Sequence, residues 1–117
     1  MKVTFLYWEG CPSHELALAR LRKVLREEGI PDDIIQVIHI KTQEDAIRHR
    51  FIGSPTIRIN GKDIDPQPQI QRYGLACRPY RITGQRWFPI PSEQMIRQAI
   101  QRAVSSSSED PLPFSVP

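Results

Sequence analysis

The residues best suited to covalent chemistry in this sequence are its two cysteines, Cys11 and Cys77. Cys11 follows an apolar segment and lies directly before Pro12, and proline is favoured at the first position of a helix. The free backbone N–H groups and the dipole at a helix start favour a thiolate over a thiol. We therefore predict that Cys11 is a reactive nucleophile. The alternative is a small, half-buried residue without chemistry.

His14 is the second candidate, because on a helix it lies one turn from Cys11 and can point toward the sulfur. A protonated imidazole would stabilise a thiolate, and a neutral one could accept the thiol proton. The alternative is a histidine that is only hydrogen-bonded to the backbone. We expect His39, in an apolar segment, and His49, in a charged one, to be structural or solvated.

Cys77 lies in a proline-rich segment, residues 65–90, which shows no sustained periodicity and which we interpret as a long structureless connection. Long connections in compact domains tend to be functional. Nearby Arg78, Arg81 and Arg86 would lower the pKa of the Cys77 thiol or hold an anionic substrate, or they are simply solvated. Cys77 itself is either a reactive thiol or a buried anchor of the loop, and the sequence leaves these alternatives open.

Three segments are expected to be the strands that position these residues. Residues 3–8 and 34–40 are rich in β-branched and aromatic side chains, which is typical of buried strands. Residues 56–59 alternate between apolar and polar side chains, and the Asn60-Gly61 pair that follows them is a strong signal for a β-hairpin. The third strand should therefore pair with a short fourth strand.

Helices are expected between and after these strands, at residues 12–28, 42–50 and 92–104. The first and the last of these segments place their apolar side chains on one helical face. Gly29 is suited to end the first helix. Thr42 and Ser92 are suited to cap the other two, and the chain thus has the order β-α-β-α-β-β-α.

Length and composition limit the class of protein. A chain of 117 residues is long enough for one domain with its own core, which we place at residues 1–104, followed by a flexible tail at 105–117. We find neither a membrane-spanning apolar run nor a charged-then-apolar leader, and we expect a soluble cytoplasmic protein. The net charge of +3 is spread along the chain, which argues against nucleic-acid binding.

The order of elements, with a Cys-Pro pair after the first strand and Ser-Pro-Thr before the third, resembles the thioredoxin fold over residues 1–104. The resemblance implies an α/β protein with three α/β/α layers and a mixed sheet of about four strands. The segments EGCPSH, GSPT and YGLACRPY look like a family of small bacterial thioredoxin-like proteins. Some members carry selenocysteine at the position of Cys11, and some are labelled alkylmercury lyase.

The resemblance implies that Cys11 attacks the substrate and that Pro55 is a cis proline facing it. The substrate-binding residues implied in the same way are Pro12, Ser13, Ser54, Pro55 and Thr56. The carbonyl of residue 54 and the N–H of residue 56 would pair with an extended peptide or a thiol compound.

The classical Cys-x-x-Cys motif is incomplete here, since His14 stands where the second cysteine would be. Another thiol must therefore resolve the mixed disulfide that Cys11 forms, and an external thiol such as glutathione is one source. We predict that Cys77 is the resolving partner. A disulfide between the two requires Cα atoms within about 7 Å of each other.

The leading hypothesis is a thiol-disulfide oxidoreductase or thiol-dependent reductase without a cofactor or resident metal, acting on a protein or small-molecule thiol or disulfide. A second hypothesis is a protein that binds zinc, copper(I) or mercury through Cys11, Cys77 and His14, because thiolates and imidazoles suit soft metals. A third is a non-catalytic interaction module. The sequence gives no prediction of the oligomeric state.

Overall fold

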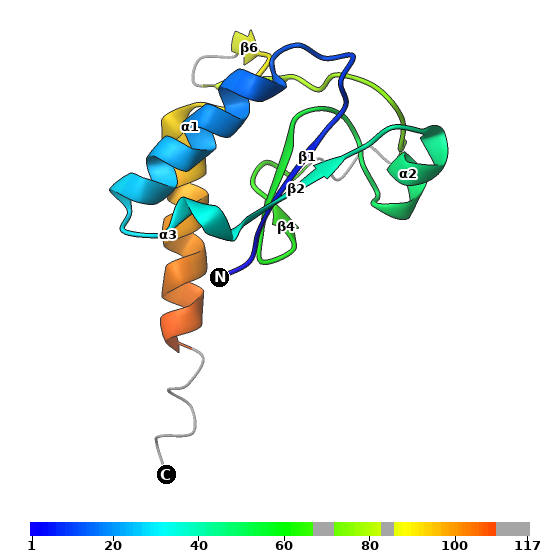
Figure 1. Ribbon diagram of the computed structural model, residues 1–117. Helices are drawn as coiled ribbons and strands as arrows, with labels where there is room; N and C mark the ends of the chain where they lie inside the picture. Colours follow the sequence, from blue (N-terminus) through cyan, green and yellow to red (C-terminus); the bar gives the residue numbers. More distant parts are fainter. Residues whose placement is uncertain (67–71, 83–85, 110–117) are drawn as a thin grey trace.

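A mixed four-stranded sheet forms the centre of the protein. The computed structural model describes residues 1–66, 72–82 and 86–109, and the strand order is β2-β1-β3-β4 (Figure 1). Strand β1 (Val3–Tyr7) is parallel to β2 (Ile35–His39) and antiparallel to β3 (Thr56–Ile59), which pairs in turn with β4 (Lys62–Asp63). The four strands and their mixed directions confirm the mixed sheet of about four strands that was expected.

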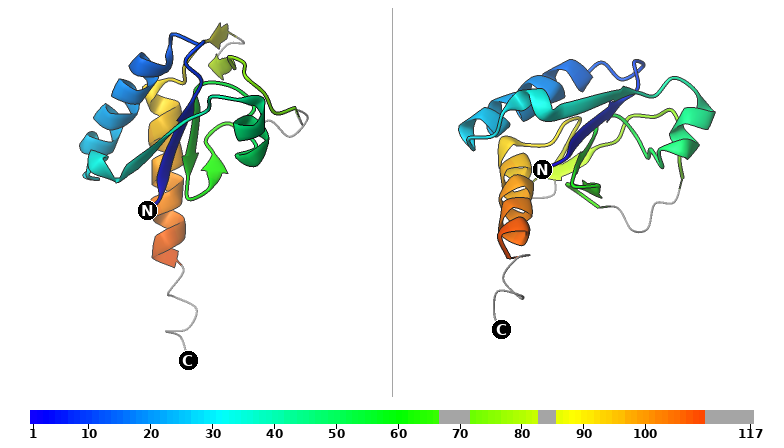
Figure 2. Two further views of the ribbon diagram at one scale, coloured as in Figure 1. Left: turned by 45° about the vertical axis from the view of Figure 1, so that its right-hand side comes forward. Right: turned by 60° about the horizontal axis from the view of Figure 1, so that its bottom comes forward.

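Helices lie on both faces of this sheet. Helix α1 (His14–Glu27) and helix α3 (Glu93–Glu109) lie together on one side of the strands, and α2 (Gln43–Arg48) lies on the other (Figures 1 and 2). A short 3-10 helix, η1 (Asp32–Ile34), leads from α1 into β2.

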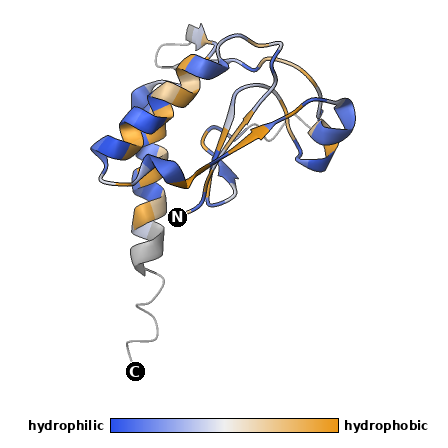
Figure 3. Cartoon of the chain, viewed as in Figure 1, coloured by the Kyte–Doolittle hydropathy of each residue, from blue (hydrophilic) through white to orange (hydrophobic). Residues whose placement is uncertain are grey.

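The two faces of β1 belong to two separate apolar clusters. Val3 and Phe5 pack with the buried faces of α1 and α3, whereas Leu6 packs against residues from α2 and its flanks. Because neighbouring side chains of a strand point to opposite faces, a run of apolar residues is required where both faces are covered. Helix α1 is covered by the sheet on one face only, and its sequence alternates accordingly between apolar and polar residues. Figure 3 shows this alternation as orange and blue bands along the helix.

The predicted helix boundaries are confirmed where a side chain caps the helix. The Thr42 hydroxyl accepts a hydrogen bond from the Asp45 N–H at 3.0 Å, and the Ser92 hydroxyl accepts one from the Met95 N–H at 3.1 Å. Gly29 follows α1 with a φ of 76°, the left-handed conformation that ends many helices.

Three helix boundaries differ from the sequence prediction by two residues or more, and one of them is the end of α2 at Arg48, where the helix was expected to continue to residue 50. Helix α1 begins at His14 and not at Pro12, so Cys11 and Pro12 lie in the turn before it. Helix α3 continues through Glu109, past the expected end at residue 104, so residues 105–109 are helical and not part of a flexible tail. The sequence has no glycine or proline between Ser92 and Pro111 that would end α3 earlier. The rest of the predicted tail, 110–117, lies outside the described residues.

The interpretation of residues 65–90 as a structureless connection was wrong in its second half. Strand β5 (Tyr80–Ile82) pairs with β6 (Arg86–Phe88) in a small antiparallel sheet. Strands of three residues are too short to show a periodicity. Residues 67–71 and 83–85 of this segment lie outside the described part of the chain. Among the described residues, no helix is both long and apolar enough to cross a membrane.

Candidate redox site

Cys11 and Cys77 form a disulfide, and their Cα atoms lie 5.6 Å apart. This separation is typical of a disulfide, and it confirms that the two residues are close although 66 positions separate them in the sequence. The sequence offered no direct evidence of this contact, since only a returning loop could bring Cys77 to the start of α1.

Cys11 is the buried half of the pair. Its exposed fraction is 2%, and its N–H donates a hydrogen bond to the Trp8 carbonyl at 3.1 Å. The Cys11 sulfur lies 3.5 Å from the carbonyl oxygen of Ser54, a distance at which a reduced thiol would donate a weak hydrogen bond. The peptide bond between Ser54 and Pro55 is cis, as the resemblance implied.

His14 holds the main chain at Cys11. Its Nδ1 lies 2.8 Å from the Cys11 carbonyl oxygen, and because a carbonyl only accepts, this nitrogen carries the proton. The imidazole is stacked with the ring of Tyr7 at a centroid distance of 4.4 Å, and Tyr7 is also stacked with His39 at 4.6 Å. The described polar contact of His14 is thus with the Cys11 carbonyl and not with its sulfur.

Cys77 is exposed and is held by main-chain hydrogen bonds on either side of it. Ser54 and Cys77 form a parallel β-bridge, in which the Ser54 N–H donates to the Ala76 carbonyl at 2.7 Å and the Arg78 N–H donates to the Ser54 carbonyl at 3.0 Å. The main chain that was predicted to bind an extended substrate at residue 54 is therefore occupied by the chain's own segment.

The residues before Cys77 are fastened to the α2 side of the sheet. The Gly74 N–H donates to the Phe51 carbonyl at 3.1 Å, and the Gln43 side-chain amide donates to the Tyr73 carbonyl at 2.7 Å. We call residues 73–78 the Cys77 segment. Together with the Ser54 bridge, these bonds fix the place at which the segment crosses the start of α1.

Gly53 allows the Cys77 segment to approach the loop before β3. Its φ of 152° is a conformation that residues with a side chain rarely adopt. A Cβ atom at this position would lie 2.7 Å from the Arg78 Cβ and 3.2 Å from the Cys77 carbonyl carbon. The two backbones can therefore be this close only because residue 53 has no side chain.

The buried side chain of Arg78 anchors the Cys77 segment to the β4 end of the sheet. Its side chain is 4% exposed, and its guanidinium forms an ion pair with Asp63 at 2.6 Å and donates to the Asp65 carbonyl at 2.8 Å. The guanidinium also lies 4.4 Å from the ring centroid of Tyr80. Of the two alternatives for Arg78, a solvated side chain is thus wrong. Its charge is paired with that of Asp63.

Tyr80 links this anchor to the cis proline. The ring is fully buried, and its hydroxyl donates a hydrogen bond to the Pro55 carbonyl. Burial raises the pKa of the Tyr80 hydroxyl well above its ordinary value, so the residue stays a neutral hydrogen-bond donor. Tyr80 thus holds the carbonyl of Pro55, while the carbonyl of the preceding Ser54 lies next to the Cys11 sulfur.

The structure brings together most of the predicted site. Cys11, His14, Ser54, Pro55 and Cys77 are neighbours, as the contacts above show. Thr56 is completely buried in β3, where its hydroxyl donates to the Gly53 carbonyl at 2.6 Å.

The remaining predicted residues contribute less. Pro12 is exposed and Ser13 is half-buried in the turn before α1. The side chains of Arg81 and Arg86 lie outside the described part of the structure. Sequence reasoning missed Asp63, Tyr80 and the role of Gly53, of which only Gly53 carried a signal, as the glycine directly before Ser-Pro-Thr.

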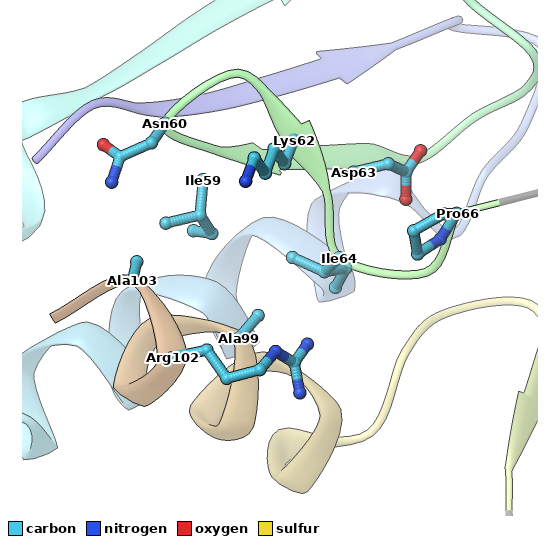
Figure 4. Close-up of a pocket in the computed structure, with 9 residues that line it drawn as sticks. All are labelled: Ile59, Asn60, Lys62, Asp63, Ile64, Pro66, Ala99, Arg102 and Ala103. Carbon is cyan, nitrogen blue, oxygen red and sulfur yellow. The ribbon is translucent and has the colours of Figure 1, made fainter. Parts of the chain in front are cut away.

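Surface hollows are formed by the described residues at two places of interest. One, of about 310 Å³, adjoins the disulfide and is lined by Cys77, Arg78, Pro79, Trp87, Phe88 and Pro89. The other, of about 330 Å³, lies between the β3–β4 hairpin and α3, with Ile59 and Ile64 among its apolar residues and Lys62 and Arg102 among its charged ones (Figure 4). Among the described residues that line this second pocket there is neither cysteine nor histidine, and it is separate from the redox site.

Comparisons with known proteins do not assign the chain to a family: no protein-family model, curated protein or solved structure matches it. Within the part of the chain that the structure describes, no group of three or more His, Cys, Asp or Glu side chains could hold a metal ion.

Proposed function

We propose that the protein is a thioredoxin-like thiol-disulfide oxidoreductase, in which Cys11 and Cys77 alternate between a disulfide and two thiols. The observation that carries this proposal is the pairing of Cys11, in the turn before α1, with Cys77, on an exposed segment. The β-α-β-α order, followed by the β3–β4 hairpin and α3, and the cis Pro55 beside Cys11 support a thioredoxin-like fold.

The reaction requires only sulfur atoms. A substrate thiolate attacks one sulfur of the disulfide and displaces the other as a thiolate, and a second substrate thiol then releases the substrate as a disulfide. Two electrons pass to the cysteine pair, and the reverse sequence reduces a substrate disulfide. No cofactor is needed for either direction.

Two features act on the reduced Cys11 in opposite directions. The start of α1 provides a positive helix end, which favours the thiolate. The Ser54 carbonyl, 3.5 Å from the sulfur, accepts a hydrogen bond only from the protonated thiol. The pH dependence of alkylation measures the sum of the two effects.

Redox titration with thiol counting tests the proposal. Wild-type protein equilibrated in a series of dithiothreitol buffers should change between two and zero alkylatable thiols in one reversible two-electron step. Reduced protein treated with iodoacetamide over a range of pH should contain at least one cysteine with an apparent pKa below the free value of about 8.5. Two thiols with ordinary reactivity, or a disulfide that no thiol reduces in the folded state, would instead identify an interaction module.

The metal-binding alternative gains no support from the described residues, among which no group of three or more His, Cys, Asp or Glu side chains could hold a metal ion. Titration of the reduced protein with zinc provides the comparison. Stoichiometric binding that vanishes when the cysteines are alkylated, together with thiols that do not exchange, would favour that alternative.

A further inference from the structure

The two cysteines of the disulfide differ in their exposure to solvent. Cys11 is 2% exposed and is covered by the Ser54 loop and by the turn that follows β1, whereas Cys77 is exposed. A thiolate attacks a disulfide in line with the S–S bond, so the attacked sulfur must be reachable from outside. Of the two cysteines, Cys77 is the one whose exposure allows such an approach.

The surface next to Cys77 is apolar. The hollow of about 310 Å³ beside it is lined by two prolines, Pro79 and Pro89, and by Trp87 and Phe88 of β6, which are 53% and 38% exposed. Figure 1 shows β6 at the same end of the molecule as the start of α1. Large aromatic side chains left exposed next to a reactive sulfur indicate a binding surface.

The charge of the hollow also limits its occupant. Among the described residues that line it, Arg78 is the charged one, and its guanidinium is already paired with Asp63 and bonded to the Asp65 carbonyl. A small anionic thiol such as glutathione would find no available cation among these lining residues. An apolar side chain next to a cysteine would fill the hollow without leaving a charge unpaired.

The other face of the Cys77 segment is closed to a partner. The Ser54 N–H and carbonyl are both bonded to this segment, so an extended peptide cannot pair there while the disulfide is present. The partner must therefore reach Cys77 from the side of the hollow.

We propose that Cys77, and not Cys11, is the sulfur that exchanges with the partner, and that the partner is a polypeptide dithiol or disulfide with an apolar side chain next to its reactive cysteine. This inference rests on the proposed function. The partner thiolate forms an S–S bond with Cys77, the Cys11–Cys77 bond breaks, and its electron pair stays on Cys11, which takes up a proton. The partner's second thiolate then attacks the partner sulfur of the mixed disulfide and releases Cys77 as a thiolate.

The site of attack is identified in the wild-type protein. Oxidised protein is mixed briefly with the thiol of the capped peptide acetyl-Ala-Cys-Phe-amide, quenched with acid and mapped by mass spectrometry. The peptide should be found on Cys77 at least about tenfold more often than on Cys11. An adduct mainly on Cys11 would overturn the inference and leave the proposed function intact, whereas no exchange with any thiol would overturn both.

The nature of the partner is tested by rate. The reduction of the oxidised protein by the peptide and by glutathione is compared, each rate being normalised to the same thiol's reaction with a small linear disulfide. The normalised rate for the peptide should exceed that for glutathione about tenfold, because burial of one apolar side chain stabilises a complex by roughly the free energy that corresponds to a factor of ten. A ratio near one would contradict an apolar partner.

A pair of matched variants shows whether the hollow causes this preference. Trp87→Gln should bring the ratio close to one, because it removes the larger aromatic ring of the hollow. Ile47→Gln, which replaces a similarly exposed apolar residue on α2, should leave the ratio unchanged. An equal effect of both variants, or no effect of Trp87→Gln, would assign the preference to something other than this surface.

Discussion

Ser54 and Cys77 lie opposite each other in a parallel β-bridge, and the hydrogen bonds of this bridge join the loop before β3 to the segment that carries the exposed cysteine. The bridge explains how a cysteine 66 positions away reaches Cys11. Because these bonds are made by the main chain, they do not depend on the redox state of the two sulfurs. The Cys77 segment should therefore stay close to Cys11 after reduction, which raises the effective concentration of one thiol near the other.

Gly53→Ala tests this close approach. The new Cβ would lie 2.7 Å from the Arg78 Cβ, and the backbone at residue 53 has a φ of 152°. We expect the free energy of unfolding of the reduced protein to fall by about 1–3 kcal/mol, the usual cost of overpacking or of a strained backbone. The disulfide should also re-form more slowly in a glutathione buffer.

Gly29→Ala is the matched control for that variant. Gly29 has a φ of 76°, but a Cβ there would meet no atom within 4 Å. It should lower stability through its backbone conformation alone and leave the rate of disulfide formation unchanged. Equal rates for the two variants would show that the contact between Gly53 and Arg78 does not position Cys77.

Asp63→Asn tests the anchor beneath Cys77. The variant leaves the guanidinium of Arg78, 4% exposed, without its carboxylate at 2.6 Å. Breaking a buried ion pair costs about 3–5 kcal/mol, and we expect the lower end because the Asp65 carboxylate lies 4.0 Å from the same guanidinium. Urea unfolding of the reduced protein measures the loss.

The exposed pair between Arg26 and Asp32 is the control. Asp32→Asn should change the free energy of unfolding by less than about 1 kcal/mol, as is usual for surface ion pairs. A similar small effect of Asp63→Asn would mean that Arg78 is held mainly by its bond to the Asp65 carbonyl and by Tyr80.

The features that the sequence predicted well are those with a local physical cause. Thr42 caps a helix because its hydroxyl meets an N–H three residues later, and the Asn60-Gly61 turn joins two adjacent strands. Cys11 could be singled out because the residues next to it in the sequence define its position.

The features that the sequence did not reveal depend on contacts between distant residues. Asp63 looked like an ordinary residue of a hairpin, and only the folded chain places it 2.6 Å from Arg78. Similarly, no local pattern indicates that Tyr80 would donate a hydrogen bond to the Pro55 carbonyl. The sequence therefore allowed Cys11, Cys77 and Pro55 to be predicted as residues of the redox site. It did not allow the prediction of Asp63 and Tyr80, which hold these residues in place.

The buried hydroxyl of Tyr80 predicts a pH dependence of stability. Burial raises its pKa, so the folded state favours the neutral form. Its contribution to stability is fully present below the unfolded pKa of about 10 and is lost as the pH rises above that value toward the folded pKa. The protein should consequently lose stability in alkali, with Tyr80 ionising only on unfolding.

Absorbance of tyrosinate and far-UV circular dichroism, recorded together during alkaline titration, measure this coupling. The tyrosinate signal that accompanies unfolding should be missing in Tyr80→Phe. This variant should also lose about 1–3 kcal/mol at neutral pH, because the buried Pro55 carbonyl loses its donor. Ionisation of Tyr80 in a protein that is still folded would contradict the proposed contact with Pro55.

His14 can now be tested by separating its two contacts. His14→Phe keeps an aromatic ring to stack on Tyr7 and removes the hydrogen bond from Nδ1 to the Cys11 carbonyl. In a Cys77→Ser background, alkylation of Cys11 at neutral pH should slow by roughly threefold or more, because the variant removes an imidazole that favours the nearby thiolate. His39→Phe is the control, since His39 is also stacked with Tyr7. Equal alkylation rates in the two variants would limit His14 to holding the main chain, and a fall in stability specific to His14→Phe would then measure that role.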